Sequence, residues 1–237
     1  MPERLVILAA GSLRAALTEY ADRWDGPSPE LVFGPAGLLR QEIERGRACD
    51  IYLSANTAHP QALARAAAVP WRTFARNPLR VMTRAGAGVR SDTLLAHMLD
   101  PRTRLGTSTP AADPSGDYAH ALFDRCNAMQ PGAGAALRAK AIAVVGAAIP
   151  QRDAVPKDHS VLKLLADDII NAFVGYRTSA VAMGSAVDVI RPPEAMAVTA
   201  TYGLVVLRPT EEADRFADGL SGPRGRAVLG PHGFDPA

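Results

Sequence analysis

The chain has 237 residues, of which 48% are hydrophobic and 21% charged, a composition that suits one large globular domain or two modest ones. A formal net charge of +2 and scattered basic residues argue against a nucleic-acid-binding surface. No stretch approaches the roughly 20 apolar residues of a membrane-spanning helix. The two cysteines, Cys49 and Cys126, exclude a disulfide framework. We expect two free, buried thiols, with a single disulfide as the alternative.

The first part of the chain alternates short β-rich runs with helical ones. Strands are expected at 4–10, 30–33 and 50–55, and they lead into helices at 12–24, 36–46 and 60–68. In the first helix Leu13, Leu17 and Tyr20 share one stripe, and Gly46 closes the second helix. Three strands separated by helices within about 50 residues predict a parallel sheet with right-handed crossovers.

The rest of the chain continues this alternation. Further strands are expected at 79–84, 104–109, 169–176, 180–183, 196–200 and 203–207. Helices are expected at 92–100, 115–129, 134–145, 160–168 and 210–220, with a last one ending near 230–234, and 149–158 is expected to be a loop. Two sheets formed by one continuous chain suit a protein of two lobes with a cleft between them. Ligands of open α/β sheets gather at the carboxyl ends of the strands.

Small and hydroxyl-bearing residues follow several of these strands, where each strand opens a helix. They are Ser12 after 4–10, Ala36 and Gly37 after 30–33, Ser115 as an expected helix cap after 104–109, and Tyr176 at the end of 169–176. A helix N-terminus offers unpaired N–H groups and about half a positive charge. Because all these groups can donate hydrogen bonds, the pattern favours a compact, deprotonated oxyanion. Ordinary helix capping is the structural alternative for any one of them.

Catalytic motifs are weak in this sequence. A serine hydrolase needs G-x-S-x-G followed by an acid and a histidine, whereas the turn at Ser12 reads AAGSL. The chain has no dinucleotide fingerprint after its first strand, no P-loop and no zinc-ligand spacing. We therefore expect no cofactor and no bound metal cation, and an anion-binding site is the first hypothesis. The second hypothesis is a small α/β enzyme for an anionic substrate, with Ser12 or Tyr176 in a catalytic role.

Five segments in order resemble one known family across essentially the whole chain. They are AAGSLRAAL, FGPAGLLRQEIERGRACDIYLSAN, GTSTPAADPSGDYAHALF, VGYRTSAV and LSGPRGRAVLGPHGF. These segments resemble the molybdate-binding (ModA-type) proteins of ABC importers. The resemblance implies a type II periplasmic binding protein fold, in which two α/β lobes are joined by two crossing strands. It implies lobes of residues 1–79 with 202–237 and of residues 80–201, and an oxyanion, molybdate or tungstate, bound in the cleft between them.

The resemblance also assigns ligand-binding roles to residues of this chain. Ser12 matches a serine that donates through its hydroxyl and its N–H, and Tyr176 matches a ligand tyrosine. Ala36 stands where the family usually has a second serine, which leaves its N–H and that of Gly37 as donors. Ser115 matches a backbone donor and adds a hydroxyl. Because one hydroxyl donor is missing, sulfate, phosphate and organic acids stay open as alternative ligands.

The expected partners follow from the same resemblance. They are a small oxyanion and the membrane permease of an ABC importer, with the protein itself a monomer that binds no nucleic acid. The apolar run at 5–10 is short and is preceded by Glu3, so it does not resemble a signal peptide. The resemblance implies a periplasmic protein whose leader is absent from this sequence.

Overall fold

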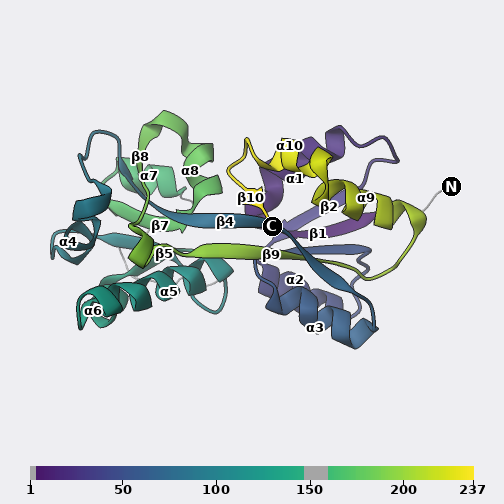
Figure 1. Ribbon diagram of the computed structural model, residues 1–237, viewed down its shortest axis with the longest axis horizontal. Helices are drawn as coiled ribbons and strands as arrows, with labels where there is room; N and C mark the ends of the chain where they lie inside the picture. The colour runs from purple at the N-terminus through teal and green to yellow at the C-terminus, as the bar shows by residue number, and fades with distance from the viewer. Residues whose placement is uncertain (1–3, 147–159) are drawn as a thin grey trace. The chain divides into compact units, whose positions relative to one another are not determined.

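The computed structural model describes residues 4–146 and 160–237, and the chain forms two compact units (Figure 1). Unit 1 contains Met1–Asn77 and Ala200–Ala237, and unit 2 contains Pro78–Thr199. The chain passes from one unit to the other in two long strands, β4 (Trp71–Arg84) and β9 (Thr199–Val206). Within the described ranges, no helix is long and apolar enough to cross a membrane.

Unit 1 is a sheet with helices on both faces. β1 (Val6–Ala10) lies between the parallel strands β2 (Glu30–Gly34) and β3 (Ile51–Ser54), and β9 pairs antiparallel with β3. β10 (Asp235–Pro236) pairs with the first half of β4. The helices of this unit are η1 (Gly11–Leu13), α1 (Arg14–Asp22), α2 (Ala36–Glu44), α3 (Ala58–Ala67), α9 (Glu211–Ser221) and α10 (Pro223–Leu229).

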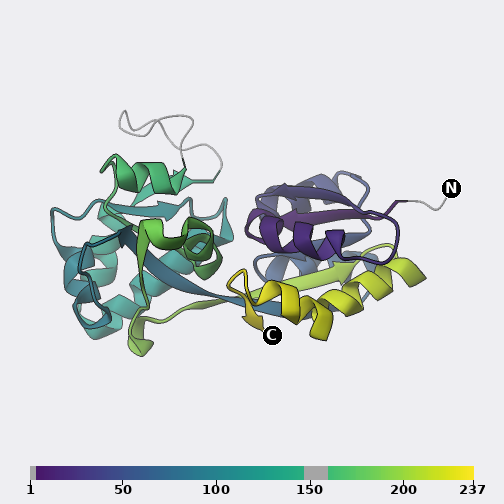
Figure 2. The same cartoon turned by 90° about the horizontal axis from the view of Figure 1, so that it is seen from above.

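The two faces of the unit 1 sheet are covered by different helices. Figure 1 shows α2 and α3 on one face and α1, α9 and α10 on the other, and Figure 2 shows α9 and α10 following one another along the unit. The α2–α3 face buries Leu8, Leu39 and Tyr52 in one apolar cluster. On the opposite face Phe216 packs edge-on against the rings of Tyr20 and Trp24, at centroid distances of 5.1 and 5.2 Å. The burial of apolar side chains on both faces holds the helices against the sheet.

Unit 2 repeats the layered arrangement around a second set of strands. The second half of β4 pairs antiparallel with β7 (Ala172–Tyr176) and with β8 (Val187–Ile190). β7 pairs parallel with β5 (Leu105–Ser108), which pairs parallel with β6 (Ile142–Val145). The helices are η2 (Ser91–Thr93), α4 (Leu94–Leu99), α5 (Pro114–Met129), α6 (Ala133–Lys140), α7 (Val161–Ala166), α8 (Arg177–Met183), η3 (Gly184–Ala186) and η4 (Glu194–Met196). Met82, Leu164 and Phe173 lie in a buried apolar cluster of this unit.

Several segments differ from the sequence-based expectation. Residues 142–145, expected in a helix, form β6, because the run Ile-Ala-Val-Val pairs with β5. Residues 180–183, expected as a strand, lie in α8. The strands expected at 196–200 and 203–207 are one strand, β9, and the strand expected at 79–84 begins at Trp71. The loop expected at 149–158 lies outside the described residues.

Candidate ligand-binding site

Three of the expected site residues lie at one edge of the unit 1 sheet. Ala10 at the end of β1 is opposite Gly34 at the end of β2, so η1 and α2 begin side by side. A Cβ placed on Gly11 would lie 4.0 Å from the Gly34 carbonyl oxygen. Ser12 is in η1, and Ala36 and Gly37 are the first two residues of α2. The parallel pairing of β1 and β2 therefore brings Ser12, Ala36 and Gly37 together.

Ser12 does not cap its own helix. Among the described residues no side chain caps η1, α1 or α2. The Oγ of the half-buried Ser12 lies instead 2.7 Å from the Oη of Tyr202, and Asn77 Nδ2 donates to the same phenol oxygen at 3.1 Å. The cap alternative for Ser12 is therefore wrong. Tyr202 and Asn77 were not anticipated from the sequence, because Tyr202 is 190 residues from Ser12 and 125 residues from Asn77.

The first turn of α2 is held from inside unit 1. Tyr52 Oη donates to the Ala36 carbonyl oxygen at 2.6 Å, and burial raises the pKa of that phenol, so it remains a donor. Ala36 itself is buried, with 1% of its surface exposed. The N–H groups of Ala36 and Gly37 belong to the first turn, in which helix geometry provides no acceptor.

A histidine and an arginine lie beside this turn, and the arginine is paired with Glu44 at 2.8 Å. A Cβ on Gly37 would lie 3.6 Å from His59 Nε2, which is ordinary van der Waals contact. The other ring nitrogen, His59 Nδ1, lies 3.4 Å from Arg40 Nη1. The absence of a side chain at position 37 thus leaves the backbone open next to an imidazole and a guanidinium.

The other two expected residues, Ser115 and Tyr176, lie at one edge of the unit 2 sheet. Tyr176 is both the last residue of β7 and the residue that precedes α8. Ser115 is the second residue of α5, which follows β5, the parallel neighbour of β7. Tyr118, one turn further along α5, packs edge-on against Tyr176 with ring centroids 6.4 Å apart. Both residues are buried, Ser115 with 5% and Tyr176 with 4% of its surface exposed.

The cap of α5 is Asp113, which corrects the expectation that Ser115 is the cap. Asp113 Oδ1 accepts a hydrogen bond from the Ser115 N–H at 3.0 Å, with Pro114 at the first helical position. Burial raises the pKa of the Asp113 carboxyl, while the bonds from the Ser115 N–H and the Ser108 hydroxyl oppose that rise. The start of α5 therefore holds a carboxylate that already uses the Ser115 N–H.

The chemistry of the remaining candidate groups is limited. Within the described part of the chain, no group of three or more His, Cys, Asp or Glu residues could hold a metal ion. Cys49 and Cys126 are free and buried, as expected. Burial raises the pKa of Cys49 to about 12 and that of Cys126 to about 11, so both thiols stay protonated at neutral pH.

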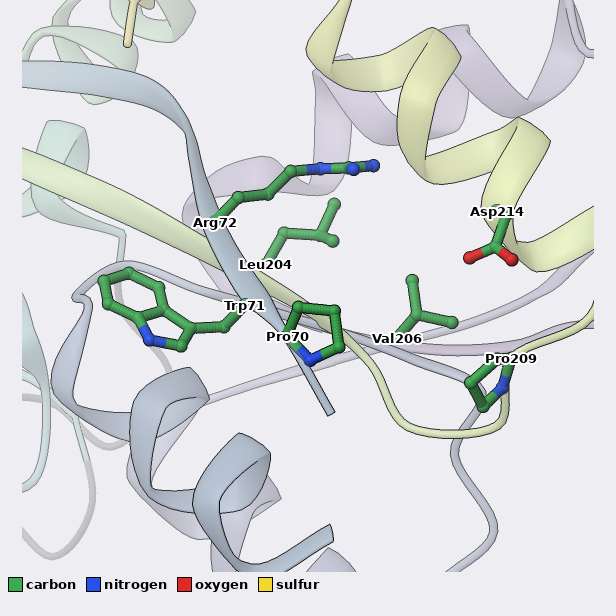
Figure 3. Close-up of a pocket in the computed structure, with 7 residues that line it drawn as sticks. All are labelled: Pro70, Trp71, Arg72, Leu204, Val206, Pro209 and Asp214. Atoms are coloured by element: carbon green, nitrogen blue, oxygen red, sulfur yellow. The ribbon is translucent and has the colours of Figure 1, made fainter. Parts of the chain in front are cut away.

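Unit 1 also has a pocket with a different lining. Its volume is about 360 Å³ (Figure 3). It is lined by Pro70, Trp71, Arg72, Leu204, Val206, Pro209 and Asp214. The expected site residues are absent from that lining, and Arg72 is paired with Asp218 at 2.7 Å. The pocket is therefore not the place where the donors of unit 1 meet.

Residues 5–235 match the family described as bacterial extracellular solute-binding protein. The chain belongs to this family. The family binds solutes and is not enzymatic, which confirms the expectation of a non-enzymatic binding protein. The hypothesis of an enzyme that acts through Ser12 or Tyr176 is therefore wrong.

The chain is also similar to individual proteins. The uncharacterized protein PM1146 of Pasteurella multocida (strain Pm70) is 36% identical over 222 residues, covering 90% of each chain. The molybdate-binding protein ModA of Mycobacterium bovis is 25% identical over 244 residues, covering 97% of this chain and 84% of its own length. The periplasmic molybdate-binding protein of Azotobacter vinelandii superposes with a TM-score of 0.76 at 15% identity, over 99% of this chain and all of the other. The type II periplasmic binding protein fold expected from the sequence is thereby confirmed.

Proposed function

We propose that this solute-binding protein serves an ABC importer, binds a tetrahedral oxyanion in the periplasm, and delivers it to a membrane permease. Molybdate or tungstate is the proposed ligand. Residues 1–79 with 202–237 form one lobe in this proposal, residues 80–201 form the other, and each lobe supplies donors to the same anion. The proposed donors are the Ser12 hydroxyl and N–H, the N–H groups of Ala36 and Gly37, the Ser115 hydroxyl and the Tyr176 phenol.

The observation that supports this proposal best is the pair of adjacent, uncapped helix starts at the edge of unit 1. Each start directs N–H groups and the positive end of a helix dipole toward the same region. A hydroxyl that is held by Tyr202 and not by its own helix lies at one of them. These groups match an acceptor with several oxygens and no proton of its own. Molybdate and tungstate have that chemistry, and a distant relative is a molybdate-binding protein.

A second ligand class is favoured by Asp113. A carboxylate beside Ser115 repels a fully deprotonated anion, but it accepts a hydrogen bond from an anion that retains a hydroxyl hydrogen. Hydrogen phosphate and hydroxy acids are anions of this kind. The alanine at position 36, where a serine hydroxyl is usual in the molybdate-binding proteins that the sequence resembles, also fits a changed ligand.

A thermal-shift screen distinguishes these ligands. The screen uses molybdate, tungstate, sulfate, phosphate and small carboxylates, with Ser12→Ala as the matched control. A ligand present at 100 times its dissociation constant stabilises the folded protein by roughly 2.7 kcal/mol. We expect the largest shift with molybdate or tungstate, and a much smaller one in Ser12→Ala. A shift confined to phosphate or hydroxy acids supports the second class, and no shift with any tetrahedral oxyanion contradicts the proposal.

A further inference from the structure

Three polar side chains of unit 1 form a continuous hydrogen-bonded chain. Asn77 Nδ2 lies 3.1 Å from Tyr202 Oη, and Tyr202 Oη lies 2.7 Å from Ser12 Oγ. Asn77 and Tyr202 are fully buried, whereas Ser12 is half-buried. The chain of bonds therefore runs from the interior of the unit to the one member that reaches its surface.

We propose that Tyr202 and Asn77 are positioning residues that hold the Ser12 hydroxyl as a hydrogen-bond donor toward the bound anion. This inference rests on the proposed function, because it assumes that Ser12 contacts an anion. It assigns a role to two residues that carry no recognisable motif in the sequence.

The groups fix the direction of the first bond, whereas the bond between the two hydroxyls can run either way. An amide NH₂ can only donate, so Asn77 occupies a lone pair of the Tyr202 oxygen. In this inference the single phenol hydrogen of Tyr202 is directed to Ser12 Oγ, which accepts it. The hydrogen of Ser12 remains available for a ligand oxygen. In the opposite sense Ser12 would donate to Tyr202 and present only lone pairs to the anion, which would repel it. Successive bonds in one direction also polarise one another, which makes Ser12 a better donor.

Packing fixes the position of the phenol oxygen. The Tyr202 ring is held edge-on by Phe234, with centroids 5.3 Å apart, and by Phe74 at 6.2 Å. A clamped Tyr202 orients Ser12 before a ligand arrives, which lowers the entropy cost of binding. Asn77 is the last residue of unit 1 before the chain enters unit 2, and Tyr202 is the third residue after it returns. Ser12 is thus bonded to Tyr202, near where the chain re-enters its unit, and through Tyr202 it is linked to Asn77, where the chain leaves it.

Calorimetric titration of the full chain with molybdate tests the inference. We expect Tyr202→Phe, which removes only the phenol oxygen, to weaken binding about five- to tenfold, and Ser12→Ala to weaken it more than tenfold. The double variant should bind as Ser12→Ala does, because Tyr202 acts through Ser12. Tyr20→Phe is the matched control, since its buried phenol bonds to the Phe216 carbonyl in the same unit, and it should bind as the wild type does. Asn77→Leu is a second variant in case Tyr202→Phe does not fold, and we expect it to lower the affinity for molybdate about two- to fivefold.

The outcomes separate this inference from the proposed function. Wild-type affinity in Tyr202→Phe, or a further loss on adding Tyr202→Phe to Ser12→Ala, overturns the positioning role alone. If molybdate does not bind the wild type, the titrations are repeated with the anion that stabilises it in the thermal screen. Binding of another anion with the same variant pattern supports the positioning role and rejects molybdate. A wild type that binds no anion overturns both.

Discussion

At the scale of single residues, the two units present opposite electrostatics at their helix starts. Ser12 brings a neutral donor to the edge of unit 1, whereas Asp113 brings a carboxylate to the start of α5 beside Ser115. In the proposed function, a fully deprotonated anion accepts a hydrogen bond from Ser12 and is repelled by the carboxylate of Asp113. Under the proposed function, the charge of Asp113 therefore weakens the binding of a dianion.

We expect Asp113→Asn to tighten molybdate binding tenfold or more at pH 7. Asparagine caps a helix about as well as aspartate, so α5 keeps its cap while the negative charge disappears. Like charges that face one another in a partly buried site repel by on the order of 1–4 kcal/mol at an effective dielectric constant of about 20. The affinity is measured by calorimetric titration. Asp117→Asn, which removes an exposed carboxylate that bonds the Ala111 N–H, is the control and should change affinity much less.

The free energy of unfolding provides a second readout of the same charge. Burial raises the pKa of folded Asp113 above its ordinary value of 3.8, so the folded state binds the proton more tightly than the unfolded state. The carboxyl therefore costs stability as the pH rises above 3.8, and it costs nothing at lower pH. In urea unfolding, the free energy of unfolding of Asp113→Asn should increase relative to that of the wild type as the pH rises above 3.8. Equal pH profiles and unchanged molybdate affinity would contradict a buried charge at this position.

The residues that the sequence could reveal are those with local signals. Ser12, Ala36, Gly37, Ser115 and Tyr176 stand where a strand ends and a helix starts, and that pattern is visible in short stretches. Asp113 also had a local signal, an aspartate directly before a proline at a helix start. Tyr202 and Asn77 had no local signal, because the fold brings them near Ser12 from distant parts of the chain.

At the scale of elements, close backbone contacts set how each helix leaves its strand. The start of α5 lies directly against the segment that leaves β5. A Cβ on Gly116 would lie 2.6 Å from Pro110 N and 2.7 Å from the Ser108 carbonyl oxygen, which are backbone atoms. The start of α2 has more room, since a Cβ on Gly37 meets only the His59 ring at 3.6 Å.

We expect Gly116→Ala to destabilise the protein by about 2–3 kcal/mol, because backbone atoms cannot move aside as a side chain does. The melting temperature, followed by circular dichroism, should fall by roughly 4–12 °C. Gly37→Ala is the matched control at the corresponding part of α2. It should leave stability unchanged or raise it slightly, since alanine is the better helix former. Equal melting temperatures for the two variants would show that the α5 contact is not as tight as described.

Helices and strands were predicted well where the spacing of apolar residues has one clear period. They were predicted poorly where pairing with a distant strand determines the conformation. The alternation of strands and helices in residues 4–67 carries clear apolar patterns, and the structure follows it. The Ala-rich run of α6 continues into Ile142–Val145, and only pairing with β5 shows that a strand begins there. The first half of β4 is rich in polar residues, and its strand conformation depends on partners such as β10.

At the scale of the whole molecule, each unit contains one set of proposed donors and one buried thiol. Cys49 lies in unit 1 with Ser12, Ala36 and Gly37, and Cys126 lies in unit 2 with Ser115 and Tyr176. Both thiols are protected from alkylation while their units are folded, by burial and by a raised pKa. The labelling rate of each cysteine therefore reports the opening of its own unit.

We expect molybdate at 100 times its dissociation constant to slow the alkylation of Cys49 and of Cys126 by about 100-fold each. If both units supply donors, opening either unit releases the anion, so both openings become rarer by the same factor. The measurement is pulsed thiol labelling in low urea, with the two cysteine-containing peptides quantified by mass spectrometry. Ser12→Ala at the same molybdate concentration is the control and should lose most of the protection at both cysteines. Protection of Cys49 alone would mean that unit 1 holds the anion by itself, and Ser115 and Tyr176 would then have no part in binding.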